Sequence, residues 1–195
     1  MIESKYLKDD IKNIQKLCTI PALKSFETKD LAKLLKLSKI RQYADKETII
    51  QEGATDQWLY FLLSGKIRIS KNGVLIATID NTGDVFGEMR MIDGLSRSTS
   101  IHAEGQATSL AVDTSAKHRL DSDDEATSLL ALLYKVMMEY VSVRLRLSNE
   151  KLIEAQQEIA RLKKCIPATK PKDQKKQTAH KEFVYTGIIE TATGG

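Results

Sequence analysis

The residues best suited to chemistry in this sequence lie in one short segment, where Gly87 and Glu88 precede an apolar turn and Arg97 and Ser98 follow it. Glycine has no Cβ, so a ligand can approach the backbone closely at Gly87. The planar guanidinium of Arg97 matches phosphate oxygens, and Ser98 adds a hydroxyl donor beside it. The carboxylate of Glu88 only accepts hydrogen bonds, and ribose hydroxyls are natural donors to it. The pattern predicts an anion site with a second, polar recognition point.

The apolar residues between these two pairs predict a short helix. Met89, Met91 and Ile92 can bury one side of that helix, and its N-terminal N–H groups would attract an anion. The simpler alternative is a surface loop between two strands, because a single Gly-Glu pair or a single exposed arginine has no specific meaning. The surrounding sequence has to decide between the two.

This segment resembles the phosphate-binding cassette of the cyclic nucleotide-binding domain family, in which Phe-Gly-Glu and an apolar triplet precede Arg-Ser/Thr-Ala. The resemblance implies that Glu88 holds the ribose 2′-hydroxyl and that Arg97 holds the cyclic phosphate. Two residues differ from the usual pattern, since Arg90 replaces a small residue and Thr99 replaces alanine. The ligand-binding residues expected in the cassette are Gly87, Glu88, Met89, Arg97, Ser98 and Thr99.

The resemblance extends over most of the chain, from about Ile20 to Lys164, because Glu52-Gly53, Tyr60 to Ile69 and Gly83 to Phe86 match the family's strand-and-glycine framework in order. It implies an α+β fold, an antiparallel β-roll or jelly-roll barrel with N-terminal helices and a long C-terminal dimerisation helix. The predicted organisation is residues 1–38 for N-terminal helices, 39–120 for the β-roll, 121–165 for the helix and coiled coil, and 166–195 for a flexible tail.

Local patterns support this organisation. Leu7 to Cys18 has apolar residues at helical spacing, and Thr28 is a plausible N-cap for a second helix. The Asn72-Gly73 pair between alternating apolar runs predicts a tight hairpin. The acidic run from Asp121 to Glu125 predicts the start of the long helix, where the helix dipole favours negative charge.

The long helix has an apolar stripe that repeats every seven residues. One row is Met138, Leu145, Leu152 and Ile159, and the second is Tyr134, Val141, Ser148, Ala155 and Leu162. About four heptads of this kind are typical of a coiled coil. A single helix packed on the roll is the alternative, and the apolar stretch from Leu129 to Met138 favours such packing for the first part. Beyond Leu147 the stripe is narrow, which favours a parallel homodimer.

Three polar residues on this helix extend the predicted site. Arg144, Ser148 and Asn149 resemble the central helix of the bacterial cyclic AMP receptor branch of the family. The resemblance implies that Arg144 pairs with Glu88 and that Ser148 and Asn149 reach the adenine amino group. We therefore expect cAMP as the ligand, with cGMP left open.

Composition restricts the other classes of function. The net charge of +4 is mild and demands no nucleic-acid partner. The two cysteines form no disulfide framework and suit a cytoplasmic location. No signal peptide is expected, because the N-terminus is charged and has no apolar core. No membrane span is expected, because the sequence has no run of about 18 apolar residues. His102 has no paired histidine in the roll, so we expect no bound metal. We also expect no enzymatic activity.

The segment after Leu162 holds a lysine-rich linker and the apolar island Phe183 to Ile189, so we expect no specific DNA binding by a helix-turn-helix. The island is either a frayed end or a docking peptide for an unknown protein effector. The sequence thus predicts a cyclic nucleotide sensor that acts as a regulatory homodimer. The alternative is a degenerate, non-binding barrel that serves as a coiled-coil scaffold or interaction protein.

Overall fold

The computed structural model describes residues 1–8 and 11–165, and the chain divides into two units, Met1–Glu150 and Lys151–Gly195. The first unit holds the folded domain. The second, as far as it is described, is the C-terminal part of a helix that ends at Cys165. The predicted linker and the tail segment 183–189 lie outside the described residues.

The N-terminal helices are confirmed: α1 (Ile11–Cys18), the 3-10 helix η1 (Pro21–Leu23) and α2 (Thr28–Lys36). The N-cap of α2 is Glu27, so the assignment of Thr28 as the cap was wrong. The carboxylate of Asp30 accepts the backbone N–H of Glu27 at 3.3 Å, which places the first helical residue at Thr28. The leucines of α2 are buried in the core.

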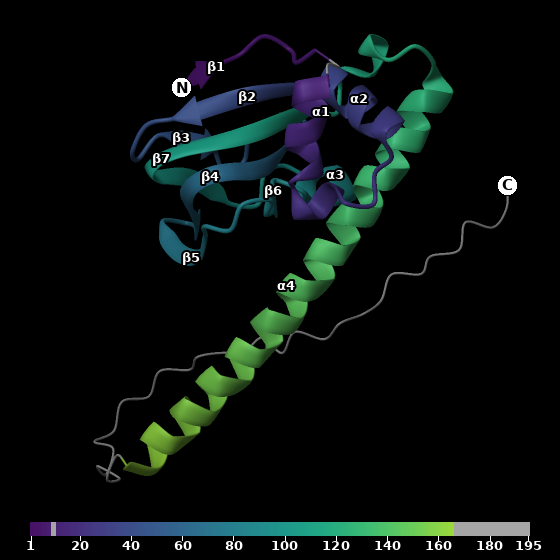
Figure 1. Cartoon of the computed structure of the whole chain (residues 1–195). Coiled ribbons are helices and arrows are strands. Elements are labelled where there is room, and N and C mark those ends of the chain that lie inside the picture. Colours follow the sequence, from purple (N-terminus) through teal and green to yellow (C-terminus); the bar gives the residue numbers. More distant parts are fainter. Residues whose placement is uncertain (9–10, 166–195) are drawn as a thin grey trace, which may run out of the picture. The chain divides into compact units, whose positions relative to one another are not determined.

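The strands form one antiparallel sheet that curls into a roll (Figure 1). They are β1 (Ile2–Glu3), β2 (Ser38–Tyr43), β3 (Thr48–Ile50), β4 (Trp58–Lys71), β5 (Val74–Ile79), β6 (Val85–Phe86) and β7 (Ser100–Asp113). The main path is β1-β2-β7-β4-β5, with β3 paired to β7 and β6 paired to β4. This path is open at both ends, so the roll is confirmed and a closed barrel is not formed. Strand β1 lies in the region predicted to be only helical.

The hairpin predicted at Asn72-Gly73 joins β4 to β5. Asn72 has a φ of 50° and Gly73 a φ of 78°, the left-handed pair that a two-residue hairpin turn requires. Strand β4 also pairs with β7 over nearly its whole length, from Trp58 opposite Asp113 to Ser70 opposite Ser100. The cassette connects to both of these long strands, because it lies in the chain between β6, which pairs with β4, and β7.

Two apolar clusters stabilise the first unit. One fills the space between the sheet, the N-terminal helices and the long helix, and it includes Leu34, Phe61 and Leu133. The other lies inside the roll, where the rings of Tyr60 and Phe86 are stacked with centroids 5.0 Å apart. The second cluster adjoins the cassette, because Phe86, one of its members, directly precedes Gly87.

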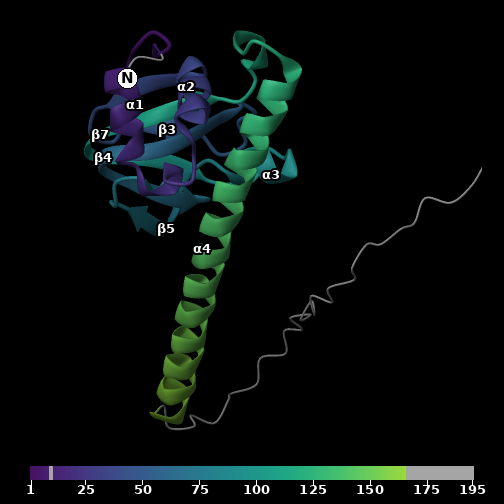
Figure 2. The same ribbon diagram turned by 45° about the vertical axis from the view of Figure 1, so that its right-hand side comes forward.

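The long helix α4 (Asp123–Cys165) begins as predicted, with three acidic residues in its first turn. The Ser122 hydroxyl accepts the backbone N–H of Glu125 at 3.2 Å. Residues such as Leu129, Leu133 and Met137 are completely buried, which confirms that the first part of the helix packs on the domain. The short helix α3 (Met89–Asp93) lies against this part of α4 (Figures 1 and 2), and the Tyr134 hydroxyl donates to the Met91 carbonyl at 3.0 Å.

Helix α4 is also the one helix of the described residues that is long and apolar enough to cross a membrane. An 18-residue window within it has a mean hydropathy of 1.3, and 28% of that window is buried in the domain. Length and composition are weak evidence, and a core helix meets the same criteria. The absence of a membrane partner therefore stays a prediction.

Candidate functional site

The cassette runs from β6 through α3 to the start of β7, and its conformation requires glycine at its beginning. Gly87 has a φ of 77°, and a Cβ added there would lie 2.9 Å from Arg97 Nη1 and 3.0 Å from Ile50 Cδ1. The guanidinium of Arg97 and an apolar side chain thus approach Gly87 closely, and the predicted approach of a ligand there stays a prediction. Both the left-handed backbone and the crowding disfavour a larger residue.

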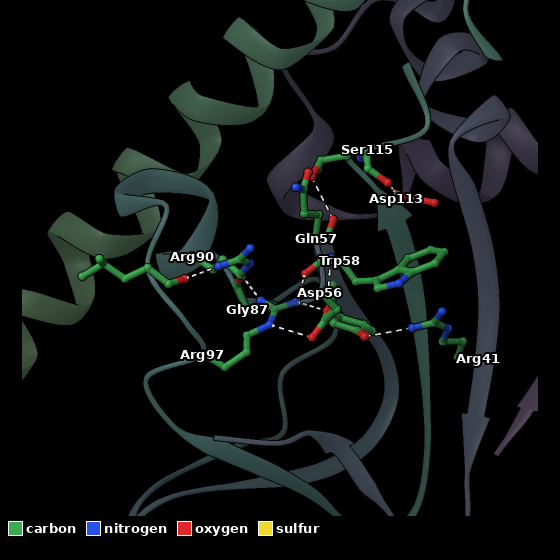
Figure 3. Close-up of polar contacts among 12 residues, drawn as sticks. Arg41, Asp56, Gln57, Trp58, Gly87, Arg90, Arg97, Asp113 and Ser115 are labelled. Atoms are coloured by element: carbon green, nitrogen blue, oxygen red, sulfur yellow. Dashed lines mark hydrogen bonds and ion pairs between the residues drawn. The ribbon is translucent and has the colours of Figure 1, made fainter. Parts of the chain in front are cut away.

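Arg97 is the most tightly held cation of the site (Figure 3). It is 4% exposed, and its Nη1 donates to the carbonyl of Gly87 at 2.6 Å. Its Nε and Nη2 donate to the two carboxylate oxygens of Asp56, and Nη2 also donates to the Trp58 carbonyl at 2.6 Å. The guanidinium is therefore fixed in one orientation beneath the cassette, with most of its N–H groups engaged.

Asp56 is a functional candidate that sequence reasoning missed. Burial alone would raise the pKa of its carboxyl, but the hydrogen bonds and charge of Arg97 outweigh burial, and the pKa lies below its ordinary value. Asp56 is thus ionised at neutral pH and neutralises Arg97. Nothing local in the sequence marks this residue, because its partner lies 41 positions away.

Glu88 begins α3 and is 6% exposed. Arg144 of α4 donates from Nη1 to Glu88 Oε1 at 2.9 Å, so the predicted ion pair between these residues is present. Arg144 also donates from Nη2 to the carbonyl of Val85. The carboxylate that is expected to meet a ribose is thus held from the other side by the long helix.

The remaining cassette residues are arranged less tightly. The Ser98 hydroxyl lies 3.7 Å from Met89 Sδ, and Thr99 is half-buried. Met89 and Ile92 are 50% and 40% exposed, so the prediction that they bury one side of α3 was wrong. Only Met91 packs on the core among the three apolar residues, because a helix of five residues has too little surface to bury them all.

Arg90, which departs from the family pattern, closes its own loop. Its Nη1 donates to the carbonyls of Gly94 at 3.2 Å and Leu95 at 2.6 Å. A cation near the C-terminus of a helix is favourable, and the two carbonyls that accept from Arg90 belong to the C-cap of α3 and to the residue after it. Gly94 ends α3 in the left-handed conformation with a φ of 70°.

Ser148 and Asn149 lie further along α4 and are exposed. Within the described part of the chain, neither makes a hydrogen bond to the cassette. Their proposed contact with a base stays a prediction, which requires a second chain or a bound ligand to complete it.

A second feature that sequence reasoning missed lies inside the roll, next to the cassette. The Arg41 guanidinium lies 3.8 Å from the centre of the Trp58 ring, and its Nη1 donates to the Tyr60 hydroxyl at 2.9 Å (Figure 3). Burial raises the pKa of Tyr60 far above its ordinary value, so this hydroxyl stays protonated. Arg41, Trp58 and Tyr60 thus form a packed cation–π and hydrogen-bonded cluster that does not titrate near neutral pH.

Metal ligation has no candidate among the described residues, since no group of three or more His, Cys, Asp or Glu side chains converges there. The cassette holds two buried charges, the carboxylate of Glu88 at the N-cap of α3 and the guanidinium of Arg97 in the loop that follows α3. This arrangement suits a neutral hydroxyl donor and an anion on one ligand.

Comparison with known proteins places the domain. Residues 40–123 match the family model of the cyclic nucleotide-binding domain. A cAMP-dependent protein kinase regulatory subunit from Eremothecium gossypii is 32% identical over 101 residues, which are 52% of this chain and 21% of that protein. Glutaminase 2 from Bradyrhizobium diazoefficiens is 28% identical over 131 residues, 66% of this chain and 21% of that protein. The chain thus spans about a fifth of the length of these curated relatives.

A solved structure agrees in fold. A cyclic nucleotide-binding domain from Methylobacillus flagellatus superimposes with a TM-score of 0.63 at 20% identity, over 74% of this chain and 84% of that one. The sequence match covers strands β3 to β7, part of β2 and the cassette, and the structural match covers a larger share of the chain. Residues 40–123 are therefore similar in sequence to the cyclic nucleotide-binding domain family, and the roll has the fold of such a domain.

Proposed function

We propose that this chain binds a cyclic nucleotide, with cAMP as the first candidate and cGMP as the second, and acts as a regulatory sensor rather than an enzyme. The observation on which this rests is the pair of buried charges on either side of α3, Glu88 at its N-cap and Arg97 in the loop that follows it. In this proposal Glu88 accepts the ribose hydroxyl and Arg97 binds the cyclic phosphate, with Ser98 beside it.

The phosphate must share Arg97 with Asp56. Because Asp56 occupies Nε and one N–H of Nη2, the ligand would meet an arginine that is already oriented but partly neutralised. The same ion pair is the observation that favours the second candidate, a non-binding scaffold. Asp56→Asn distinguishes the two, because a sensor should bind cAMP about 3- to 10-fold more tightly when the competing charge is removed, and a scaffold should show no binding before or after.

The long helix would transmit the signal. Three of its side chains contact the segment that leads into the cassette and α3: Tyr134 bonds the Met91 carbonyl, Tyr140 bonds the Gly83 carbonyl at 3.1 Å, and Arg144 bonds Glu88. A ribose that takes the Glu88 carboxylate would weaken the last of these contacts. Ligand binding can shift the helix only by its differential affinity for the two arrangements.

A second copy of the chain is the proposed partner of the exposed stripe on α4. In the first unit Met138 and Leu145 are 56% and 59% exposed, and in the second unit Leu152, Ile159 and Leu162 are each more than half exposed. A stripe of this width at heptad spacing supports a parallel homodimer. The proposal also includes an unknown protein effector, for which the 183–189 segment would be the docking peptide. It further includes no specific DNA binding and a cytoplasmic location.

Calorimetric titration with cAMP and cGMP tests the proposal. Arg97→Gln should weaken cAMP binding about 30-fold or more, because truncating one partner of a buried charged hydrogen bond costs on the order of 2–5 kcal/mol. The matched control is Arg68→Gln, which changes an exposed arginine of β4. This variant should bind cAMP with the same affinity as the wild type. No heat with either nucleotide at millimolar concentration contradicts the sensor proposal and favours the scaffold.

The base preference has its own test. Ser148→Ala combined with Asn149→Ala should lower the affinity for cAMP more than that for cGMP, since each lost hydrogen bond is worth about 0.5–1.5 kcal/mol. Equal losses for the two nucleotides, or none, would show that this part of α4 does not recognise the base.

A further inference from the structure

A cavity of about 260 Å³ lies in the first unit, beside the cassette, and shares only part of its lining with the residues expected to hold a nucleotide. Gly87 and Arg97 contribute to its wall, whereas Glu88, Met89 and Ser98 do not. Its walls come from α3, the start of β4, the loop that follows β7 and the first part of α4. The cavity therefore lies on the side of α3 that faces the buried half of α4.

The charges around this cavity are unbalanced. Arg97 and Asp56 neutralise each other, and Arg90 and Lys117 supply two further positive charges. Lys117 has no ion pair within the described part of the chain. Arg90 uses Nη1 for two carbonyls, but its Nε is shielded from solvent and has no hydrogen-bond acceptor there. A buried donor without an acceptor is unfavourable, so an entering acceptor group would be stabilised.

Apolar side chains also line the cavity. Met91, Leu130 and Tyr134 contribute to it, and the Tyr134 hydroxyl donates to the Met91 carbonyl. The mouth is formed by exposed residues, among them Gln57 and Lys117. Pockets for drug-sized ligands are about 300–1,000 Å³, so an occupant of this cavity would be smaller than those ligands.

We propose that this cavity is a second ligand site, which binds a small organic anion with an acidic head group and an apolar body the size of one ring. The head group would lie between Arg90 and Lys117, and the body would pack on Met91 and Leu130. Both carboxylates and phosphate monoesters match these groups. This proposal does not depend on the proposed nucleotide function, because Arg90 and Lys117, which would hold the head group, are not assigned to the nucleotide; Arg97 lines the cavity but is already paired with Asp56.

The test is a titration of the full chain with two probes, benzoate for the carboxylate and phenyl phosphate for the phosphate monoester, followed by calorimetry or protein NMR. We expect at least one probe to bind with a millimolar or lower dissociation constant, and the better probe identifies the head group. Lys117→Gln should weaken that probe about 5-fold or more, and Arg90→Gln by at least as much. Arg68→Gln, an exposed arginine remote from the cavity lining, is the control and should bind as the wild type does.

Lys117 is exposed, so its substitution tests the site even if Arg90→Gln destabilises the loop that Arg90 closes. The Glu88→Gln variant, which alters the proposed ribose contact, should leave probe binding unchanged whether or not the chain binds cAMP. A loss of probe binding in Glu88→Gln as large as in Lys117→Gln would place the probe in the nucleotide site and overturn the proposal. The absence of binding by both probes at tens of millimolar, or equal binding by Lys117→Gln, would overturn it as well.

Discussion

Arg144 of α4 and Glu88 of the cassette form an ion pair with an Nη1–Oε1 distance of 2.9 Å, across 56 positions of the sequence. Glu88 is 6% exposed, and the Arg144 side chain is 32% exposed. A buried carboxylate with a partly solvated partner is strongly coupled to that partner, because the carboxylate has lost most of its water. The pair thus joins the proposed ribose contact directly to the helix.

We predict that Arg144→Gln destabilises the domain by about 1–3 kcal/mol, because it leaves the Glu88 carboxylate buried without its charged partner. Chemical denaturation measures this loss. The control is Arg146→Gln, an exposed arginine of the same helix, whose effect should lie within about 0.5 kcal/mol of zero. Combining Arg144→Gln with Glu88→Gln should recover part of the loss, and strictly additive effects would show that the two side chains do not interact.

The second prediction concerns pH and the pair of Asp56 with Arg97. The folded pKa of Asp56 lies below its ordinary value of 3.8, so the ionised carboxylate stabilises the folded state above that pH. This contribution should be lost as the pH falls below about 4 and through the folded pKa. The measurement is the difference in unfolding free energy between the wild type and Asp56→Asn.

The sign of that difference is the informative result. The wild type should be the more stable protein at neutral pH, and the gap should narrow as the solution becomes more acidic. Glu104→Gln is the matched control, because its ion pairs with Lys66 and Arg68 are exposed and it should show little pH-dependent difference. A gap between wild type and Asp56→Asn that is constant with pH would show that the Asp56 charge does not stabilise the fold.

The parts of this structure that the sequence predicts are those with a local cause. The Asn72-Gly73 turn follows from the positive φ angles that its two residues tolerate. The N-terminus of α4 follows from its acidic first turn, and the cassette follows from a motif that is contiguous in the chain. Each of these features depends on neighbours within a few residues, which a pattern can record.

The features that the sequence does not predict depend on contacts between distant residues. Asp56 meets Arg97 because β3 pairs with the start of β7 and the backbones of Gly53 and Ala54 bond that of Arg97. Arg41 stacks on Trp58 across a sheet whose register is set by the whole roll. The exposure of Met89 likewise depends on how much surface the rest of the domain offers to α3. The Arg144 contact was found only through the family resemblance, since no local pattern relates it to Glu88.

The third prediction separates two effects of glycine at Gly87. Gly87→Ala and Gly53→Ala place a side chain at similar φ angles, 77° and 83°, which costs about 1–2 kcal/mol in each case. Only the Gly87 position is crowded, with Arg97 Nη1 and Ile50 Cδ1 within about 3 Å of the added Cβ. Gly87→Ala should therefore destabilise the domain more than Gly53→Ala. It should also displace Arg97 and thereby lower the affinity for a cyclic nucleotide. Equal stability and equal affinity in the two variants would show that Gly87 is needed only for its backbone angle.

The last prediction concerns the exposed stripe of α4. Leu152→Asp would place a charge in the proposed seam between two copies, where burying it costs several kcal/mol unless the helices separate. Light scattering should report a dimer for the wild type at tens of micromolar and a monomer for the variant. Gln157→Asp adds the same side chain on the polar face of the same helix and should remain dimeric. A monomeric wild type, or a dimer that survives Leu152→Asp, would show that this stripe is not where two copies meet.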